Sequence, residues 1–281
     1  MKLILSRKGF DSGAGGVASP IMPDGAMFSL PIPDESSAIR YKDIFPHGPL
    51  VRQLTKGKVN ELCGAHLDPD LFVGTIPRQP GWKPIFGQCG MGQRVLERAD
   101  VGPGDIFLYF GWFRRVERRS GVYMYVPDAP DLHVIWGWMQ IGTVLKVNSD
   151  NIPGWARYHP HISRSERRES DTVYLASDTL MIGGADVGAP GAGVFGHYED
   201  HLCLTAPGSP RGVWSLPGWF HPNQVRMPLG YHGKPERWSW QGDNTLLKTV
   251  ARGQEFVLDA DQYPEVGAWV RGLIGNSVRL K

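Results

Sequence analysis

The stretch LCGAHLDPDLF, residues 62–72, places ionisable side chains at alternate positions, His66, Asp68 and Asp70. If this segment is extended, His66 and Asp68 point to the same face, because side chains alternate along a strand. A histidine beside a carboxylate can be tuned to exchange protons near neutral pH, so the pair is suited to general acid–base catalysis. Pro69 is expected to end the extended segment and turn Asp70 elsewhere; an Asp-Pro-Asp sequence that only caps a turn is the alternative interpretation.

The same pair is also compatible with a metal site. An H-x-D pair can supply two ligands of a facial iron triad, with a distant histidine as the third. His201, followed ten residues later by Arg211, would extend this to an iron and 2-oxoglutarate pattern. A metal-dependent nuclease would instead use the carboxylates of Asp11, Asp68 and Asp70. Because the chain has nine histidines, a chance match to so short a motif is easy, and we assign neither a metal ligand nor a cofactor from the sequence.

A glycine-rich loop, SRKGFDSGAGGVASP (residues 6–20), follows the first apolar segment of the chain. Glycines allow backbone N–H groups to approach an anion closely, and neighbouring cations favour a phosphate there. The loop matches neither the Walker pattern nor GxGxxG. Asp11, in the same loop, is expected to join His66 and Asp68 in catalysis. The expected phosphate contacts are Ser6, Arg7, Lys8 and Ser12.

The segment PIFGQCGMGQRVLERAD, residues 84–100, places Gln88 and Gln93 beside glycines at the start of a short predicted helix. The N-terminus of a helix is a natural site for an anion or a carbonyl group. Glutamine amides both donate and accept hydrogen bonds, which suits the edge of a nucleobase. The alternative is structural, with the glycines allowing a close contact between helix and sheet.

The composition indicates a folded, loop-rich chain. Its 281 residues are 41% hydrophobic, with 36 glycines and 23 prolines. The formal net charge is only +2, so any affinity for nucleic acid must come from local basic patches. HExxH, GxSxG and CxxC are absent, which makes zincin proteases, serine hydrolases of the elbow type and thioredoxin-like proteins poor fits.

The location of the protein is predicted from its cysteines and its apolar segments. The three cysteines are odd in number and widely spaced, which fits neither a disulfide framework nor paired zinc ligands. We therefore expect a reducing cytoplasm. The N-terminus does not read as a signal peptide, and no stretch approaches the roughly 20 apolar residues of a membrane span. We expect no membrane partner, and the sequence identifies no protein partner.

Strand signals are commoner than helix signals along the chain. Segments rich in β-branched and aromatic residues, bounded by turn residues, predict strands. Those segments are residues 2–6, 105–113, 122–126, 133–147, 172–176 and 255–259. Helical periodicity is confined to residues 91–100 and 264–274, and residues 11–25 and 181–193 are expected to be long glycine-rich loops. The predicted fold is a sheet-dominated α+β mixture with few short helices, forming a single domain over residues 1–281.

Several segments, taken in order along the chain, resemble the family called nucleotide modification associated domain 3. The resemblance covers nearly the whole chain, so it is more specific than any one motif. It is carried by SRKGFDS, HLDPDL, GWKPIFGQCGMGQ, GPGDIFLYFGWFR, HPHI, TVYLAS, GAGVF and LTAPGSPRGVWSLP. The resemblance implies a bacterial or phage protein linked to the modification of DNA bases. It also draws attention to His161 and Arg211 as nucleotide contacts, besides Asp70, Gln88 and Gln93.

Two classes of function follow from these residues. The leading hypothesis is an enzyme acting on a nucleotide or a DNA base, with a nucleotide or DNA as its partner. The rival is a non-catalytic reader of modified bases, because the GPGDIFLYFG segment looks like a strand of the PUA-like β-barrel modules. A reader needs stacking and hydrogen bonds but no acid–base pair, so a reader would return a modified oligonucleotide intact.

Overall fold

The computed structural model describes residues 1–44, 47–164, 168–223 and 225–278. These parts of the chain contain fourteen strands and four α-helices, joined by loops and short 3-10 helices. The strands are β1 (Lys2–Arg7), β2 (Ser19–Ile21), β3 (Ile85–Gln88), β4 (Ile106–Arg119), β5 (Val122–Tyr125), β6 (Leu132–Lys146), β7 (Thr172–Ala176), β8 (Thr179–Ile182), β9 (Ala185–Pro190), β10 (Ala192–Val194), β11 (Val213–Pro217), β12 (Trp238–Gln241), β13 (Asn244–Lys248) and β14 (Glu255–Asp259). The helices are α1 (His47–Leu54), α2 (Gly90–Arg98), α3 (Pro160–Ser163) and α4 (Val266–Val278).

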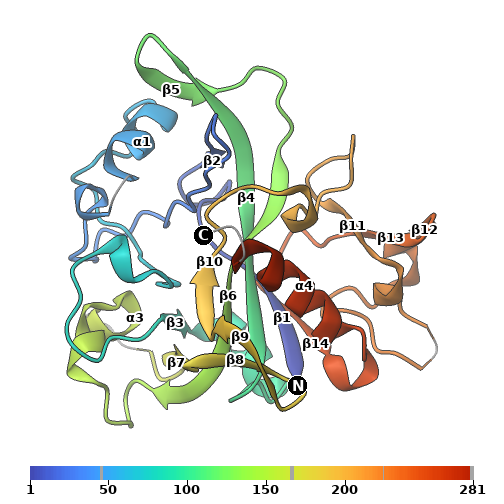
Figure 1. The fold of residues 1–281 in the computed structure, drawn as a ribbon. Helices are drawn as coiled ribbons and strands as arrows, with labels where there is room; N and C mark the ends of the chain where they lie inside the picture. Colours follow the sequence, from blue (N-terminus) through green and yellow to red (C-terminus); the bar gives the residue numbers. More distant parts are fainter. Residues whose placement is uncertain (45–46, 165–167, 224, 279–281) are drawn as a thin grey trace.

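Nine of the strands form one mixed sheet (Figure 1), with the order β14-β1-β4-β6-β7-β3. β10 pairs with β6, and β2 and β5 pair with β4. β1 and β2 run parallel to β4, and the remaining pairs of this sheet are antiparallel. Within the described residues the outer strands β14 and β3 do not pair with each other. The sheet therefore forms no closed barrel there, and a PUA-like barrel element is not confirmed.

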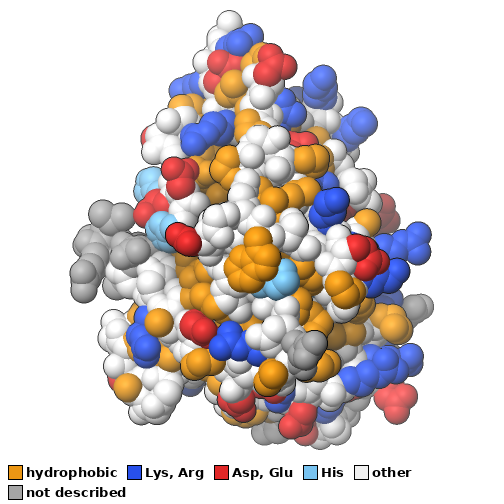
Figure 2. Space-filling view, turned by 90° about the vertical axis from the view of Figure 1, so that its right-hand side faces the viewer, with side chains coloured by type: hydrophobic (Ala, Val, Ile, Leu, Met, Phe, Trp, Pro, Cys, Tyr) orange, Lys and Arg blue, Asp and Glu red, His pale blue; other side chains and the backbone are white. Residues whose placement is uncertain are grey.

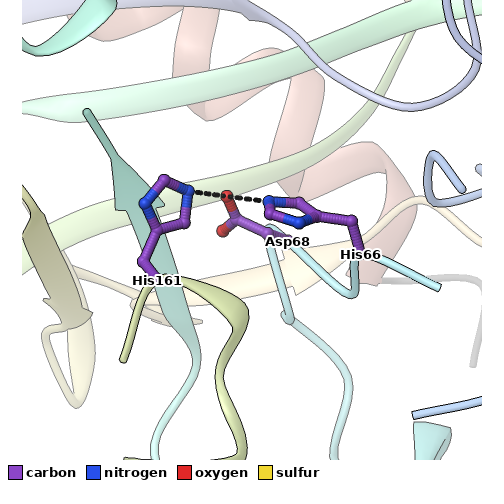
Figure 3. Close-up of side chains that lie close together, drawn as sticks. All are labelled: His66, Asp68 and His161. Atoms are coloured by element: carbon purple, nitrogen blue, oxygen red, sulfur yellow. Dashed lines mark ion pairs between the residues drawn. The ribbon is translucent and has the colours of Figure 1, made fainter. Parts of the chain in front are cut away.

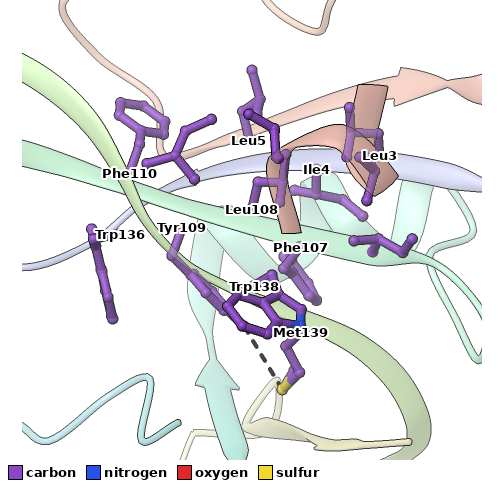
Figure 4. Close-up of a cluster of buried hydrophobic side chains, with 14 of the residues drawn as sticks. Leu3, Ile4, Leu5, Phe107, Leu108, Tyr109, Phe110, Trp136, Trp138 and Met139 are labelled. Carbon is purple, nitrogen blue, oxygen red and sulfur yellow. Dashed lines mark hydrogen bonds between the residues drawn. The ribbon is translucent and has the colours of Figure 1, made fainter. Parts of the chain in front are cut away.

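The centre of the sheet is apolar on both faces, as the run IFLYF predicts. Alternate side chains of a strand point to opposite faces, so a continuous apolar run needs cover on both sides. Figure 4 shows these side chains packed around β1, β4 and β6. Of the side chains labelled there, those exposed by 1% or less are Leu3, Ile4, Leu5, Phe107, Leu108, Tyr109, Phe110 and Met139. Burial of each such side chain contributes on the order of 1.5–3 kcal/mol before the entropy cost.

The predicted strands are all present, but strands interrupt both predicted loops. Residues 181–193, expected to be a long loop, contain most of the hairpin formed by β8 and β9, followed by β10. Gly183 and Gly184 form the two-residue turn with φ of +62° and +79°. Positive φ at both turn positions matches the twist of a hairpin and favours glycine. The glycines therefore mark a tight turn between strands, and β2 similarly interrupts the expected loop at residues 11–25.

A smaller three-stranded sheet, β11-β13-β12, flanks the large sheet (Figure 1). Figure 2 shows this side of the molecule, where hydrophobic side chains gather in the middle and charged side chains of both signs surround them. Helix α4 contacts β9 and buries Val266, Val270 and Leu273, three of the side chains that its periodicity places on one face. None of the described helices is long and apolar enough to cross a membrane.

Candidate functional site

A cavity of about 300 Å³ opens where the loop after β1 meets the segment before Pro69. Asp11, His66 and Asp68 all line it. The expectation that the two polar motifs share one pocket is therefore confirmed. The remaining wall comes from the end of β3, from Cys89 and from α3 with the residues that follow it.

Local backbone geometry sets the direction of the His66 and Asp68 side chains. The Leu67 N–H donates to the Ala65 carbonyl at 3.0 Å, and the Asp68 N–H donates to the His66 carbonyl at 2.8 Å. These successive three-residue turns preserve an alternation of side chains close to that of a strand. His66 Nε2 consequently lies 3.8 Å from Asp68 Oδ2, although no regular strand forms at these residues.

The two oxygens of Asp68 have different surroundings. Oδ1 accepts a hydrogen bond from the Gly87 N–H at 2.8 Å and lies 3.1 Å from His159 Nε2. Oδ2 faces the Nε2 atoms of His66 and His161, at 3.8 and 3.4 Å (Figure 3). The carboxylate thus stands between two imidazoles that come from segments far apart in the sequence.

Gly87 is necessary for this arrangement. A Cβ atom at this position would lie 2.5 Å from the His161 ring and 2.8 Å from the His159 ring. These separations are far below van der Waals contact, so any side chain there would displace the histidines. The absence of a side chain at Gly87 lets β3 approach α3 closely and bring its N–H to Asp68.

Each imidazole that faces Asp68 Oδ2 has a carboxylate near its other nitrogen. His66 Nδ1 lies 2.7 Å from Asp34 Oδ2, and His161 Nδ1 lies 3.4 Å from Asp171 Oδ1. Asp171 is also ion-paired with Arg164, whose Nη2 lies 3.4 Å from His161 Nδ1. The Asp34 carboxylate orients the His66 ring and stabilises the tautomer with a proton on Nδ1. At His161 the same nitrogen faces an acceptor, Asp171, and a donor, Arg164.

Burial and hydrogen bonding shift several pKa values in this cluster. The hydrogen bond with His66 lowers the pKa of Asp34. Burial raises the pKa of Asp68, but hydrogen bonds with His159 and His161 outweigh it and hold this pKa well below its ordinary value. Burial lowers the pKa of His159. For His161 burial also lowers the pKa, but hydrogen bonds with Asp68 and Cys89 raise it overall. Asp68 is therefore ionised at neutral pH.

Cys89 adds a reactive thiol to the same wall. It stands at the N-cap of α2, and Arg168 Nη1 lies 3.5 Å from its sulfur. The hydrogen bond from His161 lowers the pKa of Cys89 to about 6, and a hydrogen bond from Arg164 acts in the same direction. A thiol with this pKa is substantially a thiolate at neutral pH.

The cationic side chains of the cavity are not equivalent. Lys8 is paired with the buried carboxylate of Glu255 at 2.8 Å, and Gln88 donates to the same carboxylate at 2.6 Å. Arg7 donates to the carbonyl oxygens of residues 251 and 253. Among the described residues, neither Arg7 nor Arg168 has a carboxylate within 4.0 Å. These two arginines therefore carry charge that a ligand could neutralise.

The glycine-rich loop is closed by its own aspartate. Asp11 Oδ1 accepts hydrogen bonds from the N–H groups of Gly13 and Ala14, both at 2.7 Å. Two of the amides expected to approach a phosphate thus have an intramolecular acceptor, and Ser12 is exposed at the turn. The loop positions Arg7 and Lys8 at the cavity wall, but these amides are not available to an anion.

Four of the other predicted contacts do not line this cavity. Asp70 turns away, as expected after Pro69, and is paired with Arg78. Gln93 is buried and accepts a hydrogen bond from the Tyr174 hydroxyl at 3.0 Å. Arg211 lies over the Trp112 ring, 4.2 Å from its centroid. Ser6 is fully buried within β1, because its position in the strand faces the interior.

A second cavity, of about 390 Å³, adjoins the first, because Gly9 and Asp68 line both. Its walls are mainly apolar and include Phe28, Leu71 and Trp136. Asp68 therefore lies between a polar cavity and an apolar cavity. This combination is typical of sites that bind small organic molecules with a few oriented polar groups.

Sequence reasoning missed several residues of the site. His159 and Cys89 carried a local signal, since one belongs to the His-Pro-His pattern and the other immediately precedes a predicted helix. Asp34, Asp171 and Arg164 carried no signal that indicates these contacts. The Asp34 contact joins residues 32 positions apart in the sequence, so it depends on the fold.

Comparison with known families assigns the chain to one of them. The model of the family described as nucleotide modification associated domain 3 matches residues 2–259. No curated protein and no solved structure matches the chain. The family match extends over most of the sequence, including every residue that lines the polar cavity. The chain therefore belongs to the nucleotide modification associated domain 3 family.

Proposed function

We propose that the protein is an enzyme that acts on a nucleotide or on a base of DNA bound in the polar cavity. The observation that carries this proposal is the arrangement of the cavity walls. Arg7 and Arg168, which have no carboxylate partner in the described part of the chain, line the same cavity as a carboxylate between two histidines. Family membership supports a role associated with nucleotide modification.

The phosphate of the substrate would be bound by Arg7 and Arg168. A guanidinium group offers several N–H donors in a planar array that matches phosphate oxygens. Lys8 is less suitable, because Glu255 already neutralises it. This assignment keeps Arg7 as a phosphate contact, as the sequence predicts, but replaces Lys8 and the backbone amides of the loop with Arg168.

Proton transfer would use His66, with Asp68 as its partner. The Asp34 carboxylate holds the proton on His66 Nδ1, so Nε2 carries the lone pair and is directed at Asp68. A base at this position could remove a proton from a bound nucleotide, and the Asp68 carboxylate would stabilise the resulting imidazolium. Asp11 would contribute negative charge to the cavity that it lines. Its Oδ1 already accepts two backbone hydrogen bonds, so we assign the proton transfer to His66 and not to Asp11.

The nucleobase would occupy the adjoining apolar cavity. Aromatic side chains there, Phe28 and Trp136, provide surfaces for a planar ring. Asp68 would then lie near the junction of base and sugar, because it lines both cavities. This placement explains why the polar cavity alone, at about 300 Å³, is at the small end of the ligand sites found in proteins.

Analysis of nucleosides by mass spectrometry tests the proposal. The wild-type chain, produced in a bacterial host, should change the modified-nucleoside content of DNA or of the nucleotide pool. His66→Gln and Asp68→Asn should abolish that change, and Arg94→Ala, which removes an exposed arginine of α2 outside the cavity, should not. A wild-type chain that binds modified oligonucleotides but never alters nucleoside content would overturn the enzyme assignment and favour the reader.

A further inference from the structure

We infer that His66, Asp68 and His161 bind one divalent transition-metal ion, through Nε2, Oδ2 and Nε2. The three ligand atoms lie within 4.8 Å of one another. The inference goes beyond the proposed function, because it concerns the binding of an ion and is tested without a substrate. An ion on His66 Nε2 occupies the lone pair that proton transfer would use, so His66 can act as the base only in the metal-free protein. It also replaces His201, which the sequence offered as the third ligand, with His161.

The distances between the ligand atoms fit an ion better than direct hydrogen bonds. Bonds of about 2.0–2.2 Å to a common metal place neighbouring ligand atoms roughly 3.0–3.5 Å apart. Asp68 Oδ2 lies 3.4 Å from His161 Nε2 and 3.8 Å from His66 Nε2. The second separation is too long for a hydrogen bond. A small movement of the His66 side chain, which is 20% exposed, would complete the geometry.

The groups behind the ligands have the arrangement that metal sites use. Histidine ligands usually donate their other N–H to a carboxylate, which fixes the ring and raises the basicity of the coordinating nitrogen. Asp34 stands 2.7 Å from His66 Nδ1, and Asp171 stands 3.4 Å from His161 Nδ1. The arrangement is complete at His66, whereas His161 Nδ1 also lies 3.4 Å from Arg164 Nη2. Both Nε2 atoms face Asp68 Oδ2.

Asp68 is held so that one oxygen faces that point. The Gly87 N–H and His159 Nε2 engage Oδ1, at 2.8 and 3.1 Å. Oδ2 therefore remains available as a single coordinating oxygen, and it faces His66 and His161. His159 is thus a positioning residue, because it acts on the ion through Asp68.

The ligand set indicates the class of metal. Two imidazoles and one carboxylate suit Fe²⁺, Co²⁺ or Zn²⁺, whereas Mg²⁺ and Ca²⁺ prefer oxygen ligands. All three residues line the polar cavity, so the remaining coordination positions would face its interior. A structural zinc site would instead be closed by four protein ligands.

A second group, Cys89, His161 and Asp171, also brings ligand atoms within 4.8 Å of one another. The charges around it disfavour an ion. The Arg164 guanidinium is paired with the Asp171 carboxylate, and the backbone N–H of Arg168 donates to the same carboxylate at 2.7 Å. An added cation would be repelled by the Arg164 guanidinium and would have to displace Arg164 from Asp171. The set centred on Asp68 has no arginine or lysine within 4.0 Å of its carboxylate among the described residues.

Titration of the metal-free protein with Co²⁺ and Zn²⁺, followed by calorimetry without nucleotide, tests the inference. We expect one ion per chain, and an affinity lowered about 100-fold or more in His66→Gln, His161→Gln and Asp68→Asn. The matched control His201→Gln and the variant Cys89→Ser should bind as the wild type does. Circular dichroism establishes that each variant is folded.

Three results would overturn the inference: no binding to the wild type, unchanged affinity in folded His66→Gln or His161→Gln, or loss of binding in Cys89→Ser. The last would assign the ion to the second group. Because no nucleotide is present, failure here is distinct from failure of the proposed reaction, which the nucleoside analysis measures separately.

Discussion

Asp68 and Asp70 are buried carboxylates on either side of Pro69, and their surroundings differ fundamentally. Asp70 is paired through both oxygens with Arg78, at 2.6 and 2.7 Å, and also accepts from the Tyr158 hydroxyl at 2.6 Å. Asp68 has one oxygen fixed, and the other faces two imidazoles. A permanent cation closes the Asp70 site, whereas groups that can lose a proton surround Asp68.

This difference separates a structural ion pair from a candidate site. Arginine remains charged at every accessible pH, so Asp70 and Arg78 satisfy each other and leave no capacity for a ligand. Histidine can lose its proton and present a lone pair, so the cluster at Asp68 can accept a proton or an ion. Burial alone does not distinguish the two carboxylates, because both side chains are at most 5% exposed.

The largest effect should come from breaking the closed pair. Asp70→Ala leaves the Arg78 guanidinium, whose side chain is 9% exposed, without its carboxylate. We expect the free energy of unfolding in urea to fall by about 3–5 kcal/mol. The metal affinity of the folded variant should match that of the wild type. A loss of stability under about 1 kcal/mol would show that the pair is not structural.

Asp68→Asn should have the opposite effects, with little change in stability but loss of metal binding. The amide oxygen can still accept from the Gly87 N–H, and neutral imidazoles beside the amide leave no buried charge unpaired. We expect unfolding free energy within about 1 kcal/mol of the wild type, with metal binding and nucleoside modification lost. A variant as unstable as Asp70→Ala would contradict the distinction between the two sites.

Asp34→Asn tests the support behind His66. The amide can still contact His66 Nδ1 but no longer provides the negative charge that orients the ring. Removing such a partner lowers metal affinity by about 10–100-fold. Calorimetric titration measures this, and Asp24→Asn, a turn residue outside the polar cavity, is the control. Equal affinity in both variants would exclude a role for Asp34.

His133 is a buried histidine whose ring is hydrogen-bonded to Trp214 Nε1 and has no carboxylate partner among the described residues. Burial lowers its pKa from 6.5 to about 3. Below pH 6.5 the His133 ring therefore binds a proton in the unfolded chain but not in the folded chain. The neutral ring stabilises the fold above that pH, and this contribution is lost as the pH falls toward about 3.

Between about pH 7.5 and about pH 5, this linkage should cost about 2 kcal/mol of unfolding free energy. His133→Gln retains an acceptor for Trp214 but cannot titrate, so its stability should fall less over the same range. Urea denaturation at both pH values gives the comparison. Equal pH dependence in the two proteins would show that His133 makes no such contribution.

The strands could be predicted because their signal is local. β7 and β14 match the predicted segments, residues 172–176 and 255–259, since β-branched and aromatic residues are bounded by turn residues there. The polar motif at residues 62–72 could also be identified from alternation. The partners of this motif could not be predicted, because His159 meets Asp68 across 91 positions, where α3 contacts β3.

The tight turn at Gly183 and Gly184 shows that a high density of glycines does not by itself distinguish a long loop from a hairpin turn. In the glycine-rich loop at residues 6–20 the sequence predicts that backbone amides approach a phosphate, but Asp11 itself accepts hydrogen bonds from two of them. An aspartate two or three positions before a glycine or alanine competes with any external anion for the same N–H groups.

X-ray absorption spectroscopy of the cobalt-loaded wild-type protein tests the central claim most directly, because it identifies the atoms bound to the ion. The account predicts two imidazole nitrogens, with oxygen ligands from Asp68 and water, and no sulfur. A sulfur neighbour at about 2.3 Å, or a shell with only one imidazole, would contradict it. Either result would move the ion from Asp68 to Cys89 or to an unrelated surface site.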